Sequence, residues 1–189
     1  WLKHFGDLWT VLQLQENSNP VMLALYEGGQ KVDFHFFPYD ELYRLITTQT
    51  LPDSCRRGYR VVVDKDQLAS KLPPPRYEPP DYHKPTEKAF VFQVHAFWYG
   101  VVYVAKQIRR RNLWVVKAAD WRIKQNLLKM LEWHAQVTHP TKIDTWHDGH
   151  FLSQWVNART HAALQDIFGT YEARSCWQAL FATTDLFHH

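Results

Sequence analysis

The sequence predicts an α+β protein in which a strand-rich part precedes a helical part. In the first part, short extended runs rich in β-branched and aromatic residues are separated by turns that contain glycine. After residues 72–85, which hold six of the ten prolines, apolar residues recur at helical spacing. A proline-rich stretch continues neither a helix nor a central strand. We therefore expect a first domain over residues 1–72, a linker over 73–85 and a helical bundle over 86–189.

The first part is predicted to contain a hairpin and several further short elements. Two extended runs, at 21–26 and 31–37, flank the turn residues EGGQ and so predict a β-hairpin. Upstream, residues 1–16 favour a short helix followed by a strand. Asp40 is placed to cap a short helix after the hairpin. Residues 59–64, YRVVVD, predict another strand because valine is β-branched.

The second part is predicted to be entirely helical. A long apolar helix starts at Thr86 and Glu87 and runs to about Arg109, and we expect it to be buried on most sides. A second long helix starts at Asn112 and carries two apolar ridges. The first ridge is formed by Val116, Ile123, Leu127 and Met130, and the second by Trp114, Trp121 and Leu128. Shorter helices are expected at 151–156, 159–168 and 171–187.

Charged residues lie between the two apolar ridges of the second long helix. Lys117, Asp120 and Lys124 follow one another at offsets of three and four residues and therefore share one face. A charged ridge between two apolar ridges is typical of a helix that lines a polar cleft. The same spacing fits a solvent-exposed ion pair between Asp120 and Lys124 equally well, so both interpretations stay open.

Composition places the chain among globular proteins. The formal net charge of +3 is too small to indicate nucleic-acid binding by itself. The most apolar run, residues 90–105, is shorter than the roughly 20 residues that a membrane helix needs. Cys55 and Cys176 are expected to be free thiols of a reducing compartment, with a lone disulfide as the alternative. We expect a cytoplasmic location, since no charged-then-apolar signal sequence opens the chain.

Histidines and aromatic residues give weaker indications of a metal site or a sugar-binding site. His139, His147 and His150 lie near one another in the sequence, but HDGH at 147–150 lacks the ligand set of a zinc site. The adjacent Trp133 and His134 are interpreted as helix packing rather than as a platform for a sugar ring.

Several pieces of the chain resemble one known family. The strings YVAKQIRR, NLWVVK and DWRIKQNLLKMLEWHA, within residues 103–135, resemble the C-terminal helical domain of the streptomycin (aminoglycoside 6-) adenylyltransferases. Further pieces occur in the family's order: GGQKVDFHFFP at 28–38, VVVDKDQL at 61–68, KPTEKAF at 84–90, HDGHFLSQWVNART at 147–160 and YEARSCWQALFATTDLF at 171–187. With the strings of 103–135 counted as one piece, six pieces in a fixed order are hard to obtain by chance.

The resemblance implies a nucleotidyltransferase of the polymerase-β type, with a partial mixed β-sheet domain before the helical bundle. It implies transfer of AMP from ATP to a hydroxyl of a streptomycin-type aminoglycoside, with Mg²⁺ held by carboxylates. The string KVD places Asp33 at the family's third metal-binding carboxylate, and Mg²⁺ prefers such oxygen ligands. From the residues alone, alternation puts Lys31, Asp33 and His35 on one face of a strand, which an ordinary solvent-facing sheet also shows.

The resemblance also implies roles in the helical part. Asp120 is expected to be the second catalytic residue, the base that accepts the proton of the attacking hydroxyl. Lys106, Lys117 and Lys124 are expected to contact the triphosphate. From the residues alone, Lys106 is equally well explained as a cation near a helix C-terminus, where it favours the helix dipole. The expected partners are ATP and a small-molecule aminoglycoside.

One part of the family's pattern is absent from the sequence. Before Asp33 the only acidic residues are Asp7, Glu16 and Glu27, with no Gly-Ser element and no paired aspartates. We expect those elements to lie upstream of Trp1, and this chain alone to be inactive because it cannot hold both metal ions. The alternatives are a family member that binds nucleotide without catalysis, a nucleotidyltransferase that acts on a protein or RNA, and a helical interaction domain appended to a degenerate core.

Overall fold

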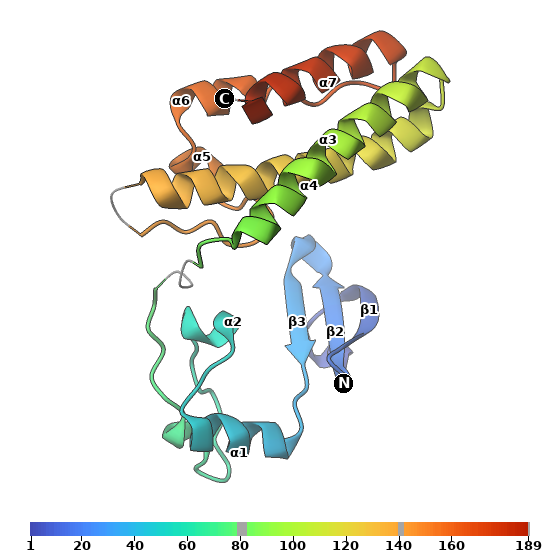
Figure 1. Ribbon diagram of the computed structural model, residues 1–189. Helices are drawn as coiled ribbons and strands as arrows, with labels where there is room; N and C mark the ends of the chain where they lie inside the picture. The colour runs from blue at the N-terminus through green and yellow to red at the C-terminus, as the bar shows by residue number, and fades with distance from the viewer. Residues whose placement is uncertain (79–82, 140–141, 189) are drawn as a thin grey trace. The chain divides into compact units, whose positions relative to one another are not determined.

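A computed structural model describes residues 1–78, 83–139 and 142–188 of the chain. The chain divides into two compact units, Trp1–Glu78 and Pro79–His189. The expected α+β class is confirmed, because the first unit contains a β-sheet and the described part of the second consists of helices and loops (Figure 1). The middle of the expected proline-rich linker, residues 79–82, lies outside the described residues.

The first unit contains a sheet followed by short helices. Its elements, in chain order, are η1 (Leu2–Phe5), β1 (Leu8–Glu16), β2 (Asn19–Tyr26), η2 (Glu27–Gly29), β3 (Lys31–His35), α1 (Tyr39–Thr48), α2 (Asp53–Arg56) and η3 (Ala69–Lys71). The strands pair in the order β1-β2-β3, and both pairings are antiparallel, which differs from the expected mixed sheet. The expected hairpin is confirmed as β2 and β3, joined by a turn in which Gly28 and Gly29 have φ of 78° and 77°.

The η1 turn covers one face of this sheet. The rings of Trp1 and Phe5 lie 5.0 and 5.4 Å from the ring of Phe34, and the Tyr26 hydroxyl donates to the carbonyl of Leu2 at 3.1 Å. Because side chains alternate along β3, Asp33 lies on the opposite face from Phe34. Asp33 is therefore placed on the face that η1 leaves open.

Residues 59–64, expected to be a strand, form none. The Asp64 carboxylate accepts the backbone N–H groups of Leu68 and Ser70, at 3.0 Å each, and so holds this segment in a local turn. Val62 is 76% exposed. A run of valines forms a strand only where another strand pairs with it, and in the described structure none does.

The expected cap of α1 is also wrong. The helix begins at Tyr39, directly after Pro38, so Asp40 lies inside the first turn instead of at the N-cap. Proline at the boundary sets the extended backbone that precedes the helix. A carboxylate in the first turn still interacts favourably with the N-terminal end of the helix dipole.

The second unit is built around two long helices. Its elements are α3 (Glu87–Arg109), α4 (Leu113–Thr138), α5 (Leu152–Trp155), α6 (Ala158–Ala163) and α7 (Ala173–His188). Helices α3, α4 and α7 pack against one another (Figure 1) around a core that includes Phe97, Ile108, Ile123, Leu127 and Leu180.

Local signals set the ends of the long helices where they were expected. The Thr86 hydroxyl accepts the N–H of Ala89 at 3.2 Å, which caps α3. Asn112 occupies the N-cap position of α4, but its side-chain amide donates to Gln107 at 3.0 Å instead of capping the helix.

One of the short helices differs from expectation: helix α6 ends at Ala163, earlier than the expected end at residue 168.

Exposure of the long helices differs from expectation in two places. Helix α3 is not buried on most sides, since Phe92, Tyr99 and Val102 are 70%, 77% and 68% exposed. On α4 the first apolar ridge is largely buried, but Trp114 and Trp121 of the second are 79% and 58% exposed. A unit of three packed helices covers only one face of each helix. Among the described residues no helix is long and apolar enough to cross a membrane.

Candidate functional site

Two regions contain the residues that the sequence singles out. Asp33 lies in the sheet unit, and the charged ridge of α4 lies in the helical unit. The two regions belong to different units and are described separately.

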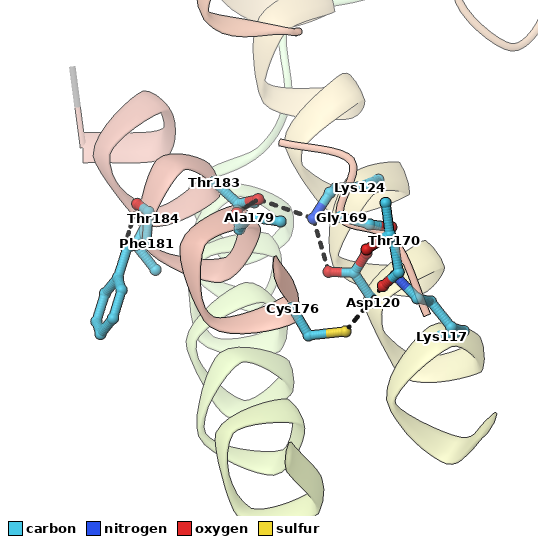
Figure 2. Close-up of polar contacts among 10 residues, drawn as sticks. All are labelled: Lys117, Asp120, Lys124, Gly169, Thr170, Cys176, Ala179, Phe181, Thr183 and Thr184. Atoms are coloured by element: carbon cyan, nitrogen blue, oxygen red, sulfur yellow. Dashed lines mark hydrogen bonds and ion pairs between the residues drawn. The ribbon is translucent and has the colours of Figure 1, made fainter. Parts of the chain in front are cut away.

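The charged ridge of α4 forms a buried polar cluster against α7 (Figure 2). The Lys124 ammonium donates to Asp120 Oδ1 at 2.6 Å and to the Thr183 hydroxyl at 2.7 Å. Thr183 in turn donates to the carbonyl of Ala179 at 2.6 Å, one turn earlier on α7. Side-chain exposure is 4% for Lys124 and 14% for Asp120. The interpretation as a solvent-exposed ion pair is therefore wrong.

Packing around the Lys124 ammonium explains why it stays inside the protein. Helical spacing puts Asp120 one turn before Lys124, so the ion pair forms within α4. Thr183 is fully buried and supplies the second acceptor from α7. The ring of Phe168 lies 6.0 Å from the ammonium and covers it from the loop before α7. A buried ammonium needs such partners, because its desolvation is costly.

Thr183 was not identified from the sequence as a functional residue. A signal for it does exist: Thr183 follows Cys176 by seven residues and Leu180 by three, so it shares the buried face of α7 with two apolar residues. A polar side chain on such a face usually has a buried partner. Pairing it with Lys124 requires the tertiary structure.

Burial lowers the pKa of Lys124 below its ordinary value of 10.5, although the hydrogen bond that its ammonium donates to Asp120 opposes this shift. In the unfolded chain the Lys124 ammonium keeps its proton up to about pH 10.5. In the folded protein the same ammonium loses its proton at a lower pH. The contribution of Lys124 to stability therefore rises with pH between the lowered pKa and 10.5. We expect the wild-type chain to gain stability relative to Lys124→Met across this range.

Urea denaturation of both proteins, from neutral pH to pH 10.5, measures this difference. Lys129→Met, which removes a half-exposed lysine from the same helix, controls for the lost charge. A difference in free energy of unfolding between wild type and Lys124→Met that stays constant with pH would contradict the prediction.

Lys117 connects α4 to the loop before α7. Its ammonium donates to the carbonyl of Gly169. The same loop is held to α7 by a hydrogen bond from Thr170 N–H to Ser175 Oγ at 2.8 Å and by the Cys176 thiol, 3.4 Å from the Thr170 carbonyl. Lys117 thus fixes the loop that carries Phe168 over the buried cluster.

Lys106, the third expected nucleotide contact, lies elsewhere on the helical unit. It is exposed near the end of α3. Within the described residues, no hydrogen bond or ion pair joins its side chain to Asp120 or Lys124. The structure joins Asp120 and Lys124 by a hydrogen bond, whereas Lys117 on the same helix face donates to Gly169. Lys106 lies outside this group.

Asp33 is accessible on the open face of the sheet. Its Oδ2 accepts from the Lys31 ammonium at 2.9 Å, and the side chain is 36% exposed. Leu23 lies opposite Asp33 on β2, and Leu12 lies opposite Leu23 on β1. The second oxygen, Oδ1, has no hydrogen bond in the described part of the chain. An accessible carboxylate with one free oxygen fits Mg²⁺ as a single ligand, since Mg²⁺ usually keeps water and substrate phosphates as the others.

In the described part of the chain, Asp33 belongs to no group of three or more carboxylate, histidine or cysteine side chains that could hold a metal ion. Among the described residues, no three such side chains lie close enough to hold an ion, and this includes the histidines of the 147–150 loop. Cys55 and Cys176 are both free, as expected.

Comparison with known proteins places the chain in a family. The sequence profile of the family described as streptomycin adenylyltransferase matches residues 1–189. The chain belongs to the streptomycin adenylyltransferase family. The resemblance carried by the motifs at 28–38, 103–135 and 171–187 is thereby confirmed.

Individual family members are distant in sequence. The chain is 22% identical over 166 residues to an aminoglycoside 6-adenylyltransferase of Bacillus subtilis (strain 168), a match that covers 87% of this chain and 56% of that protein. Aminoglycoside 6-adenylyltransferases of Campylobacter jejuni and Staphylococcus aureus are 23% and 24% identical, over 99% and 100% of this chain and 65% and 68% of theirs. The chain therefore spans between 56% and 68% of the length of these relatives.

A solved structure supports the fold. The crystal structure of an aminoglycoside 6-adenyltransferase from Bacillus subtilis matches this chain with a TM-score of 0.52 and 18% sequence identity. The match covers all of this chain and 70% of that one.

Proposed function

We propose that this protein transfers AMP from ATP to a hydroxyl group of a streptomycin-type aminoglycoside. The observation that carries the proposal is the match of the streptomycin adenylyltransferase family along residues 1–189. The three aminoglycoside 6-adenylyltransferases that resemble the chain support adenylyl transfer as the reaction.

In the proposed reaction the acceptor hydroxyl oxygen attacks the α-phosphorus of ATP. A new O–P bond forms, the bond from the α-phosphorus to its β-bridging oxygen breaks, and pyrophosphate leaves. The hydroxyl proton passes to Asp120, whose Oδ2 has no hydrogen bond in the described structure while Oδ1 is held by Lys124. Because Lys124 holds Oδ1 of this carboxylate and is itself held by Thr183, the free oxygen is preorganised to accept a proton.

We propose that Asp33 supplies one carboxylate oxygen to Mg²⁺. When bound, this ion neutralises charge that develops on the leaving phosphates. Asp33 contributes the free Oδ1, and Lys31 holds Oδ2. Protein ligands beyond Asp33 would have to come from residues not grouped around it in the described structure.

The lysines divide into two groups under this proposal. Lys106 is exposed and free to contact phosphate oxygens. Lys117 and Lys124 already donate to Gly169 and to Asp120 with Thr183, so a phosphate contact would replace one of these hydrogen bonds. A contact of these two lysines with the triphosphate stays a prediction. The free cysteines and the use of ATP favour action in the cytoplasm.

The direct test is transfer of labelled AMP. Full-length protein is incubated with α-labelled ATP, Mg²⁺ and either streptomycin, another aminoglycoside or no acceptor, and the products are separated. We expect a labelled aminoglycoside and one pyrophosphate per AMP transferred, only when acceptor and Mg²⁺ are both present. Labelled protein or RNA without labelled aminoglycoside would instead support a different acceptor and overturn the proposal.

A further inference from the structure

The helical unit contains a groove that the proposed mechanism does not yet use. Its volume is about 750 Å³, within the range of small-molecule sites. The groove lies between the C-terminal half of α4, the α6 segment and the end of α7, and the residues just before and within the start of α3 complete it. All of its lining belongs to one unit.

Aromatic and aliphatic side chains form most of the groove wall. Trp133 and Phe90 line it together, with ring centroids 6.3 Å apart and planes inclined at 32°. Met130 and Leu186 add aliphatic surface. The interpretation of Trp133 as helix packing is thus incomplete, because this ring also borders an open cavity. A flat aromatic wall can contact the C–H face of a sugar-like ring or a planar cation.

Two carboxylates at the groove have no hydrogen-bond or ion-pair partner among the described residues. Asp166 follows α6 and Asp185 lies on α7, and both line the groove. In the part of the chain that the structure describes, neither side chain forms a hydrogen bond or ion pair. Lys84 and Arg159 also line the groove. A ligand with separated cationic groups could pair with Asp166 and Asp185 while keeping its charges away from the Lys84 ammonium and the Arg159 guanidinium.

The groove adjoins the buried cluster that contains the proposed base. Leu127 and Ala182 line it, and they lie three residues after Lys124 and directly before Thr183. Along α4, seven residues separate Asp120 from Leu127, which corresponds to about 10 Å of helix. A ligand of several linked rings is long enough to rest in the groove and extend toward Asp120.

We propose that this groove binds the acceptor through its amino- or guanidino-substituted rings, an inference that rests on the proposed function for the identity of that acceptor. The rings pack against Trp133 and Phe90, and the cationic substituents pair with Asp166 and Asp185. The occupant is thus a ring-based polycation, the chemical class to which streptomycin belongs.

Calorimetric titration of streptomycin into the 189-residue chain, without ATP or Mg²⁺, tests the groove independently of turnover. We expect binding that weakens with salt, and about tenfold weaker binding for each of Asp166→Asn, Asp185→Asn and Trp133→Leu.

Asp148→Asn removes an 84% exposed carboxylate outside the groove, and this control variant should bind as wild type does. Sucrose, a neutral ring compound, should not bind. Thermal denaturation checks that every variant is folded.

Arg159→Gln should not weaken streptomycin binding, unlike the aspartate variants. Removing this like charge should leave streptomycin binding unchanged or tighten it a few-fold, whereas a site for an anion would bind its ligand more weakly. The proposal is overturned if streptomycin does not bind, if the two aspartate variants bind it as tightly as wild type, or if Arg159→Gln weakens binding.

Failure of the groove and failure of the proposed function give different results. AMP transfer to streptomycin that persists in the Asp166→Asn/Asp185→Asn protein would overturn the groove and leave the proposed function intact. Binding that depends on both aspartates, without any AMP transfer by full-length protein, would support the groove and overturn the proposed function.

Discussion

Replacing Asp120 with asparagine is expected to lower the free energy of unfolding of the helical unit by about 3 kcal/mol. The Lys124 ammonium would stay buried without its counter-charge, and with only 4% of its side chain exposed, water cannot replace the lost carboxylate. Among the described residues, Thr183 would remain as its one acceptor outside α4. Urea denaturation followed by circular dichroism measures the change.

A double-variant cycle separates this ion pair from general damage to the helix. In Asp120→Asn/Lys124→Met no charge is left buried, so most of the lost stability should return. Asp148→Asn makes the same chemical change at an exposed position, and its effect should stay within about 0.5 kcal/mol. A double variant as unstable as Asp120→Asn alone would show that the buried ammonium is not the cause.

Replacing Asp33 with alanine is expected to reduce AMP transfer at least about hundredfold, because the proposed Mg²⁺ would lose a protein ligand worth several kcal/mol. Stability should change by no more than about 0.5 kcal/mol, since Asp33 is partly exposed and pairs only with the surface residue Lys31 in the described structure. Steady-state rates of the full-length protein and urea denaturation measure the two quantities.

Lys31→Gln is the matched control for Asp33→Ala. It removes the same ion pair but keeps the carboxylate, so transfer should stay within a few-fold of wild type. In Asp33→Glu, partial activity should return at raised Mg²⁺ concentration, because a carboxylate is restored at a changed distance. Undiminished transfer by Asp33→Ala would remove Asp33 from the site.

Elements whose signals are local could be predicted from the sequence. Helix α3 begins at Glu87 because the Thr86 hydroxyl caps it. Helix α4 begins at Leu113, directly after the expected N-cap position Asn112, although the Asn112 side chain does not cap it. The strand expected at 59–64 failed for the opposite reason. Its valines have high β-propensity, but strand formation depends on a distant partner that local sequence does not supply.

In the candidate site too, the sequence predicts which residues share a face, and only the tertiary structure decides whether that face is buried. Alternation along β3 places Asp33 on one face of the strand, and helical spacing places Lys117, Asp120 and Lys124 on one face of α4. Neither pattern tells whether such a face meets water or protein. Asp33 is on a partly exposed face, whereas the α4 face is covered by α7 and the loop that carries Phe168.

The amino-acid sequence alone determined the family, the extents of the long helices and the set of charged residues that share a face. Only the tertiary structure decided that Lys124 is buried, that Thr183 is its partner and that Trp133 borders a groove with Asp166 and Asp185. The physical reason is that helical and strand periodicity fix the direction of a side chain relative to its own backbone, while burial and pairing depend on segments that are distant in the chain.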